Sequence, residues 1–219
     1  MEISTSILSV KKENAIQTFY NLEVAKTDYF HIDVMDGKFV EQNTTENMLE
    51  YATTIKHISN IPLDIHLMVK KPIEQIKKYI PLNPTYITIH YESFKNEKEL
   101  EDTLLYIKQN GCRAGISIKP NTPVEKIYSY LGKISLILVM TVEPGYGGQE
   151  LITNTISKID KLSNYIKENK LNCYIEADGG INLNNINQLK SSGLDIAVVG
   201  SAIINSNHMK ETIAKMKAQ

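Results

Sequence analysis

The sequence predicts a (β/α)8 barrel, also called a TIM barrel, that takes in residues 1–219 as one domain. Eight short apolar segments of strand length follow one another along the chain. Between them lie segments in which apolar residues return at helical spacing, as in helices packed on a sheet. The length of 219 residues also fits, because such barrels often span roughly 200 to 250 residues as a single unit. An open, doubly wound sheet uses the same alternation and stays as the alternative.

The predicted elements follow in regular order. The strands are expected at residues 3–8, 29–35, 63–69, 86–91, 113–119, 136–142, 173–178 and 196–199. The clearest helical segments are 11–22, 97–109, 152–167 and 183–190. Gly111 and Gly193 each follow a helical segment, which is typical of a helix C-cap. Pro62, Pro72 and Pro123 stand at element starts, where a missing N–H is tolerated.

Composition and charge exclude several classes of function. Lys and Arg number 24 against 25 Asp and Glu, so the net charge of -1 argues against a nucleic-acid partner. No apolar run approaches the ~20 residues that cross a bilayer. The N-terminus lacks an export signal, so we expect a cytoplasmic protein. Cys112 and Cys173 form no Cys-x-x-Cys pair, and we expect both to be small buried side chains.

Ionisable side chains gather on the inward face of three predicted strands. Side-chain alternation places there His31 and Asp33, Asp64 and His66, and Glu176 and Asp178. Burying such groups is costly unless they pair or bind a metal. Nearest the mouth, the two imidazoles and two carboxylates of His31, Asp33, His66 and Asp178 suit one divalent ion such as zinc, iron(II), manganese or cobalt. The alternative is a hydrogen-bonded polar core.

Three further residues lie near this group. Asp64 and Glu176 stand one layer deeper, where they either accept a hydrogen bond from a ligand imidazole or simply fill the barrel floor. His90 shares the inward parity of Thr88 in the fourth strand. Since no second polar partner is expected in that strand, we place His90 behind the four residues at the mouth.

The rim of the predicted barrel combines glycines with methionines. Glycine-rich loops follow the sixth, seventh and eighth strands: Gly145-Tyr146-Gly147-Gly148, Gly179-Gly180 and Gly200-Ser201. Backbone N–H groups of such loops can hold a phosphate, and the last two loops are its usual place in barrel enzymes. Met35, Met68 and Met140 end on inward positions and predict an apolar collar, with ordinary core packing as the alternative.

Together these motifs resemble the ribulose-phosphate 3-epimerase family. The resemblance spans nearly the whole chain, in order, through Ser6-Ile-Leu-Ser9, HIDVMDGKFV at 31–40, DIHLMV at 64–69, VMTVEPGYGGQ at 139–149, EADGGI at 176–181 and VGSAI at 199–203. It implies a single catalytic barrel of the ribulose-phosphate-binding type. It also implies interconversion of D-ribulose 5-phosphate and D-xylulose 5-phosphate through a 2,3-enediolate, a step of the pentose phosphate pathway.

The resemblance also assigns roles to residues. It implies that His31, Asp33, His66 and Asp178 bind the metal and that Asp33 and Asp178 act as the acid/base pair. The positions that match substrate and phosphate contacts are Ser6, His66, Gly147, Gly148, Gly179, Gly180, Gly200 and Ser201. The apolar collar matches Met35, Met68 and Met140. No organic cofactor is implied, and the partners are a ketose phosphate and further copies of the chain, as a dimer or hexamer.

The chain departs from the family pattern at Thr5, at Lys11 and at Glu41-Gln42-Asn43. The last departure follows the strand that carries His31 and Asp33, so it bears on the choice of sugar. A ketohexose phosphate, as in allulose-6-phosphate 3-epimerase, is therefore the alternative substrate, although Gly180 and Gly200-Ser201-Ala202 resemble the pattern of the pentulose enzyme more closely. Two other functions stay open. One is a phosphate-binding lyase or decarboxylase, for which Lys119 at the end of the fifth strand is the candidate lysine although it has no partner cluster. The other is a sugar-phosphate sensor without catalysis.

Overall fold

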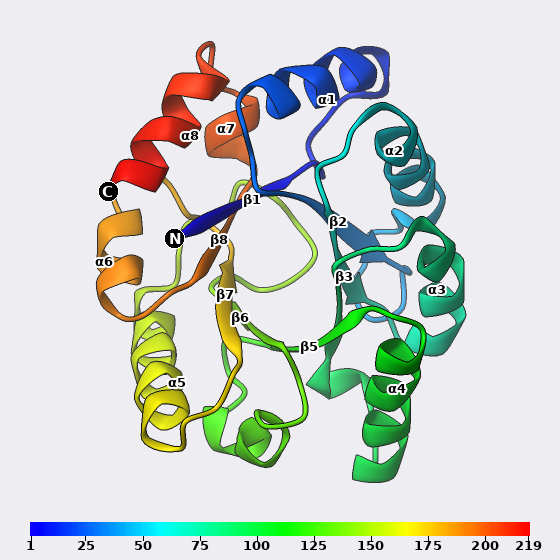
Figure 1. Ribbon diagram of the computed structural model, residues 1–219, viewed down its shortest axis with the longest axis vertical. Helices are drawn as coiled ribbons and strands as arrows, with labels where there is room; N and C mark the ends of the chain where they lie inside the picture. Colours follow the sequence, from blue (N-terminus) through cyan, green and yellow to red (C-terminus); the bar gives the residue numbers. More distant parts are fainter.

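The computed structural model describes residues 1–219 and contains a closed barrel of parallel strands (Figure 1). Each strand pairs with the next along the chain, and β8 closes on β1. The strands are β1 (Glu2–Ser6), β2 (Tyr29–Met35), β3 (Leu63–Met68), β4 (Tyr86–His90), β5 (Arg113–Ile118), β6 (Leu136–Met140), β7 (Tyr174–Asp178) and β8 (Ile196–Val199). The predicted barrel is confirmed, and the open sheet is wrong because no strand is left with a free edge.

Helices surround the strands on the outside, and the C-terminal helix packs beside the first one (Figure 1). The α-helices are α1 (Ala15–Val24), α2 (Thr45–Ile58), α3 (Pro72–Tyr79), α4 (Glu97–Gln109), α5 (Ile156–Glu168), α6 (Ile186–Ser191), α7 (Ser201–Ile204) and α8 (Met209–Ala218). Short 3₁₀ helices are η1 (Lys12–Asn14), η2 (Ile80–Leu82), η3 (Tyr91–Ser93), η4 (Val124–Tyr130) and η5 (Thr153–Thr155). None of the helices has both the length and the apolar character needed to cross a membrane.

The connection between β5 and β6 departs from the α-helical pattern. It is the 3₁₀ helix η4, in which Val124, Ile127 and Tyr130 are buried. Their spacing of three residues fits the 3.0 residues per turn of a 3₁₀ helix, so all three reach the core from one face. Pro123 precedes the helix and fixes the backbone at its start.

The outward-facing strand residues form the main core beneath the helices. Ile32 and Val34 of β2, and Ile65 and Leu67 of β3, have no exposed surface and pack in this cluster. Their neighbours in sequence point to the barrel axis, because side chains alternate along a strand. The same alternation that builds the core therefore sends His31, Asp33 and the other polar residues inward.

An apolar layer closes the floor of the barrel. Tyr29, Tyr86, Leu136 and Ile196, one from each even-numbered strand, form a separate buried cluster. The rings of Tyr29 and Tyr86 lie 5.7 Å apart between centroids. Four side chains from alternate strands are the layer arrangement that (β/α)8 barrels use. This floor blocks the lower end, so only the end formed by the strand C-termini is open to a ligand.

Candidate metal and substrate site

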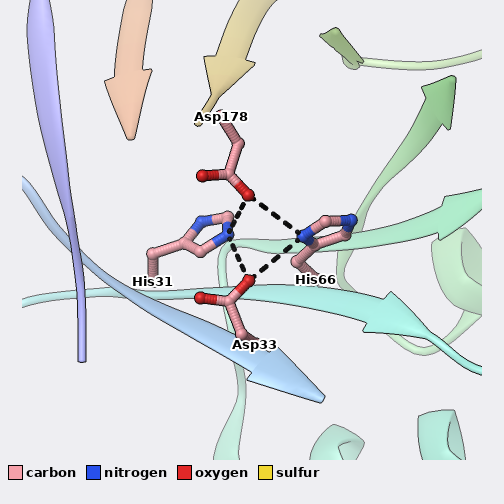
Figure 2. A group of neighbouring side chains, drawn as sticks. All are labelled: His31, Asp33, His66 and Asp178. Carbon is pink, nitrogen blue, oxygen red and sulfur yellow. Dashed lines mark hydrogen bonds and ion pairs between the residues drawn. The ribbon is translucent and has the colours of Figure 1, made fainter. Parts of the chain in front are cut away.

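Four side chains converge at the mouth of the barrel, as predicted (Figure 2). His31 and Asp33 come from β2, His66 from β3, and Asp178 from the end of β7. Oδ1 of Asp33 lies 3.4 Å from Nε2 of His31 and 3.3 Å from Nδ1 of His66. Oδ2 of Asp178 lies 3.9 Å and 3.7 Å from the same two nitrogens. One atom of each side chain thus borders the same small space, within 4.8 Å of the others.

The protonation of His31 is set by the layer below. Its Nδ1 lies 2.6 Å from Oδ2 of Asp64, which also accepts a hydrogen bond from Ser4 Oγ at 2.8 Å. Because a carboxylate only accepts, Nδ1 carries a proton, and in the neutral ring Nε2 is the nitrogen that keeps a lone pair. Nε2 of His31 is buried and has no hydrogen-bond partner. A buried lone pair that faces two carboxylates is the arrangement of a metal ligand, so the donor set fits a divalent cation.

The two carboxylates of the cluster have opposite electrostatic environments. Burial raises the pKa of Asp33, but the neighbouring His31 and His66 outweigh it, so the pKa is lowered. For Asp178, burial and the charge of Asp33 raise the pKa to about 7. Burial lowers the pKa of His31, but Asp64 and Asp33 reverse this and raise it well above its ordinary value. A divalent cation would replace the protons that this cluster otherwise holds.

The deeper carboxylates Asp64 and Glu176 behave differently from each other. Asp64 accepts a hydrogen bond from Nδ1 of His31, as one of the two predictions for this residue expects. Glu176 makes no hydrogen bond to His31 or His66, and neither of its carboxyl oxygens has a hydrogen-bond partner. Burial and the charge of Asp64 raise the pKa of Glu176 well above its ordinary value. The raised pKa favours the neutral form of Glu176, and the absence of a hydrogen bond to a histidine agrees with the alternative prediction that this residue fills the barrel interior.

His66 also has a partner, and this partner is His90. Their Nε2 atoms lie 2.9 Å apart, and Nδ1 of His90 lies 3.1 Å from Oε2 of Glu92. The sequence placed His90 behind the cluster but missed Glu92, which lies in η3 beyond the end of β4. Because β4 ends at His90, the alternation of side chains along a strand gives no signal for Glu92.

A pocket opens above the cluster at the strand C-termini, and its walls come from most of the predicted residues. They are Ser6, Asp33, Met35, Met68, Met140, Gly147, Gly148, Asp178, Gly179, Gly180, Gly200 and Ser201. His31 and His66 do not form part of the wall. Both are fully buried and reach the space from below. The predicted site residues are thus brought together in two layers, with the imidazoles under the pocket and the glycine loops around its rim.

The loops after β2 and β6 meet at the edge of this pocket. Tyr146 Oη donates a hydrogen bond to Oε2 of Glu41 at 2.8 Å. A Cβ on Gly145 would lie 3.3 Å from that of Val40. The β2 loop is ordered by Asp36, whose Oδ1 accepts hydrogen bonds from the backbone N–H of Lys38 and Phe39. The segment that departs from the family pattern therefore contacts Tyr146, which lines the pocket.

Lys119, the candidate lysine of a lyase, does not reach the pocket. Its Nζ lies 4.3 Å from the ring centroid of Phe39, a cation–π contact. It is absent from the residues that line the cavity. This placement removes the residue on which the lyase hypothesis depends.

Known proteins are similar to this chain over nearly its whole length. The family model described as "Ribulose-phosphate 3 epimerase family" matches residues 2–204. A ribulose-phosphate 3-epimerase of Helicobacter pylori strain J99 is 35% identical over 97% of this chain and 95% of the relative. The Escherichia coli K12 protein of the same name is 33% identical over 99% of this chain and 95% of the relative. The chloroplastic ribulose-5-phosphate-3-epimerase of Arabidopsis thaliana is 32% identical over 99% of this chain and 76% of its own.

Solved structures share the fold at lower identity. A 3-keto-L-gulonate-6-phosphate decarboxylase from Vibrio cholerae matches with a TM-score of 0.75 and 12% identity, over 99% of this chain and 95% of that one. A 3-hexulose-6-phosphate synthase from Salmonella typhimurium matches with a TM-score of 0.71 and 15% identity, over 100% and 97%. At such identity the likeness concerns the barrel alone. The family model and the similarity to full-length relatives go further, and they show that this chain belongs to the ribulose-phosphate 3-epimerase family.

Proposed function

We propose that this chain interconverts D-ribulose 5-phosphate and D-xylulose 5-phosphate by inverting carbon 3 of the sugar. The observation that carries the proposal is the pair of Asp33 and Asp178. They come from β2 and β7, line one pocket, and direct one oxygen each at the same two imidazoles. Membership of the family supports the same reaction, because the relatives named as ribulose-phosphate 3-epimerases cover nearly all of the chain.

Inversion at carbon 3 requires two proton carriers. The hydrogen on carbon 3 is acidic because this carbon lies next to the ketone at carbon 2, and its removal leaves a planar 2,3-enediolate. A proton that returns from the opposite side inverts the centre. Two carboxylates on different strands can stand on the two faces of the plane, so that one removes the proton and the other supplies a new one. Their roles exchange for the reverse reaction.

The environments of the two carboxylates suit this division. Oδ2 of Asp33 accepts a hydrogen bond from Ser6 Oγ at 2.7 Å, and the pKa of Asp33 is lowered, so it is a carboxylate. The pKa of Asp178 is raised to about 7, so near neutral pH it can hold or release a proton. Pairs of titratable groups whose pKa values are pushed apart are typical of acid/base partners.

The four-residue cluster would hold one divalent cation, such as zinc, iron(II), manganese or cobalt. His31 would contribute Nε2, His66 Nδ1, and Asp33 and Asp178 one oxygen each. When bound, this cation supplies Lewis-acid stabilisation of the negative charge that develops on the ketone oxygen. The proposed reaction moves only a proton, so it requires no organic cofactor.

The rim supplies the remaining contacts to the substrate. We assign the phosphate to the backbone of Gly147, Gly148, Gly179, Gly180, Gly200 and Ser201, which border the pocket. Ser6 lines the same pocket, and we assign it, with the underlying His66, to the sugar. The buried side chains of Met35, Met68 and Met140 would exclude water around the reacting carbon. A cytoplasmic location and a homo-oligomer, as a dimer or hexamer, stay predictions.

A second substrate, D-allulose 6-phosphate, is favoured by one specific observation. Glu41, in the segment that differs from the family pattern, contacts Tyr146, which lines the pocket. A longer sugar would extend toward this contact. The chemistry at carbon 3 would be the same, since the two sugars differ in chain length and not at the reacting carbons.

The test is direct. The protein is incubated with D-ribulose 5-phosphate or D-allulose 6-phosphate, and formation of the 3-epimer is followed by carbon-13 NMR before and after chelation and zinc re-addition. We expect faster epimerisation of the pentulose, lost on chelation and restored by zinc. Faster reaction of the hexulose would transfer the assignment to the second substrate. Tight binding without epimerisation would favour a sensor, and cleavage of a carbon–carbon bond would favour a lyase.

A further inference from the structure

A hydrogen-bonded series of polar side chains, formed by the buried His66 and His90 and the partly buried Glu92, leads away from the cluster. Nε2 of His66 lies 2.9 Å from Nε2 of His90, and Nδ1 of His90 lies 3.1 Å from Oε2 of Glu92. Both imidazoles are fully buried, and their rings stack with centroids 5.0 Å apart. His31 meets its carboxylate, Asp64, directly. His66 reaches a carboxylate only through a second imidazole.

The Glu92 end of this hydrogen-bonded series is fixed by the backbone. Oε1 of Glu92 accepts a hydrogen bond from the backbone N–H of Lys119 at 2.8 Å and a short one from Thr122 Oγ1. Burial raises the pKa of Glu92, but hydrogen bonds from His90, Thr122 and Lys119 lower it to about 2. Glu92 is therefore a carboxylate that can only accept. It follows that Nδ1 of His90 carries a proton and donates a hydrogen bond to Oε2 of Glu92.

The His66 end of the series requires the same assignment of protons to ring nitrogens. A cation at Nδ1 of His66 leaves the proton of that ring on Nε2. Two N–H groups cannot face each other at 2.9 Å, so Nε2 of His90 must accept, and the proton of His90 must lie on Nδ1. Proton assignment from the metal side and from the Glu92 side thus agrees at every nitrogen.

Packing holds His90, the middle member of the series, in place. The ring of Phe39 lies against His90, with centroids 4.7 Å apart, and Lys119 Nζ lies on Phe39. Phe39 belongs to the loop after β2, and Lys119 and Thr122 belong to the segment after β5. His90 and Glu92 therefore connect two loops at the barrel mouth to a single nitrogen of His66.

We propose that His90 and Glu92 are positioning residues that fix the ring and the tautomer of His66, so that Nδ1 presents its lone pair to a divalent cation. This inference rests on the cation site proposed above. Partners that orient metal-ligating histidines commonly change metal affinity or activity about 10- to 100-fold when replaced. We expect the same range here, although neither residue touches the cation.

Glu92→Gln is the sharpest variant, because it keeps the shape and reverses one hydrogen bond. If the glutamine oxygen still accepts from Lys119 and Thr122, the amide NH2 faces Nδ1 of His90. His90 must then move its proton to Nε2, and His66 must move its own to Nδ1, the atom that faces the cation. We expect the zinc dissociation constant of the metal-stripped variant, measured by competition with a chromophoric chelator, to rise about 10- to 100-fold.

Glu125→Gln is the matched control, since Glu125 is an exposed carboxylate that pairs with Lys161 on the outside of the barrel. Its zinc affinity should equal that of the native protein. Equal zinc affinity in Glu92→Gln and the native protein would overturn the inference but leave the proposed function intact. Absence of zinc binding by the native protein would overturn both the cation site and this inference.

A second measurement does not depend on the folding of any variant. In native protein loaded with zinc and labelled with nitrogen-15 in histidine, long-range proton–nitrogen correlation spectra distinguish the two ring nitrogens. We expect a proton on Nε2 of His66 and on Nδ1 of His90. A proton on Nε2 of His90 would overturn the inference, because that nitrogen could then not accept from His66.

Discussion

Oδ2 of Asp64 lies 2.6 Å from Nδ1 of His31, one layer below the atoms that would bind the cation. The contact holds the imidazole in the tautomer whose Nε2 has its lone pair free. Asp64→Asn keeps an acceptor but removes the negative charge that makes His31 a better ligand. We expect its zinc dissociation constant, measured by chelator competition, to rise about 10-fold or more.

Glu176→Gln is the matched control for Asp64→Asn in the same layer. Burial and the charge of Asp64 raise the pKa of Glu176, which favours its neutral form, so we expect this substitution to change no charge. We expect zinc affinity close to native. An equal loss of affinity in both variants would mean that the charge of Asp64 has no special role.

Asp178 predicts a pH dependence of stability in the metal-stripped protein. Its pKa is raised from 3.8 to about 7, so it takes up a proton on folding. Its contribution to stability is complete below the ordinary pKa and is lost as the pH rises toward 7. We therefore expect the free energy of unfolding of the native protein, minus that of Asp178→Asn, to fall between about pH 4 and pH 7. Urea titrations across this range test it, and a constant or rising difference would contradict the raised pKa.

The rim glycines predict a contrast between two substitutions. Gly180 has a φ of +68°, and an added Cβ would lie 2.3 Å from the backbone N of Leu151. Gly148 has a similar φ of +74° but open space around it. Gly148→Ala should cost about 1–2 kcal/mol of stability from backbone strain alone. Gly180→Ala should cost more and also raise the KM for the sugar phosphate. Equal losses in urea unfolding would show that the close approach to Leu151 is unimportant.

The contact between Tyr146 and Glu41 predicts an effect on substrate binding. Tyr146→Phe removes one hydrogen bond across the pocket entrance, and a bond of this kind contributes about 0.5–1.5 kcal/mol. We expect a KM about 2- to 10-fold higher, with unchanged zinc affinity. Tyr20→Phe, at an exposed tyrosine of α1, is the control and should leave the kinetics unchanged. An unchanged KM in Tyr146→Phe would mean that the two loops act independently.

Much of the barrel and of the cluster could be predicted from alternation alone. Side chains on a strand alternate between two faces, so His31 and Asp33 necessarily lie on the same side as each other. Parallel strands in sequence order then bring His66 and Asp178 to the same mouth. The apolar residues between them, such as Ile32, are equally constrained because they must reach the core.

Other features have no local sequence signal. Glu92 lies in η3, where the strand has ended and alternation no longer applies, so its bond to His90 could not be assigned. Glu41 and Tyr146 are 105 positions apart, and only the folded loops bring them together. Alternation also does not tell which nitrogen of His66 faces the cluster, because ring orientation depends on the His90 contact.

The central claim is that Asp33 and Asp178 act from opposite faces of the sugar. The most direct measurement is the isotope content of carbon 3 during early turnover of protiated D-ribulose 5-phosphate in heavy water, followed by proton NMR. We expect the newly formed epimer to carry deuterium while the remaining substrate keeps its proton. Replacement of either aspartate by asparagine should slow the reaction about 10²- to 10⁴-fold. An epimer that retains the original hydrogen, or native rates in both variants, would contradict the account.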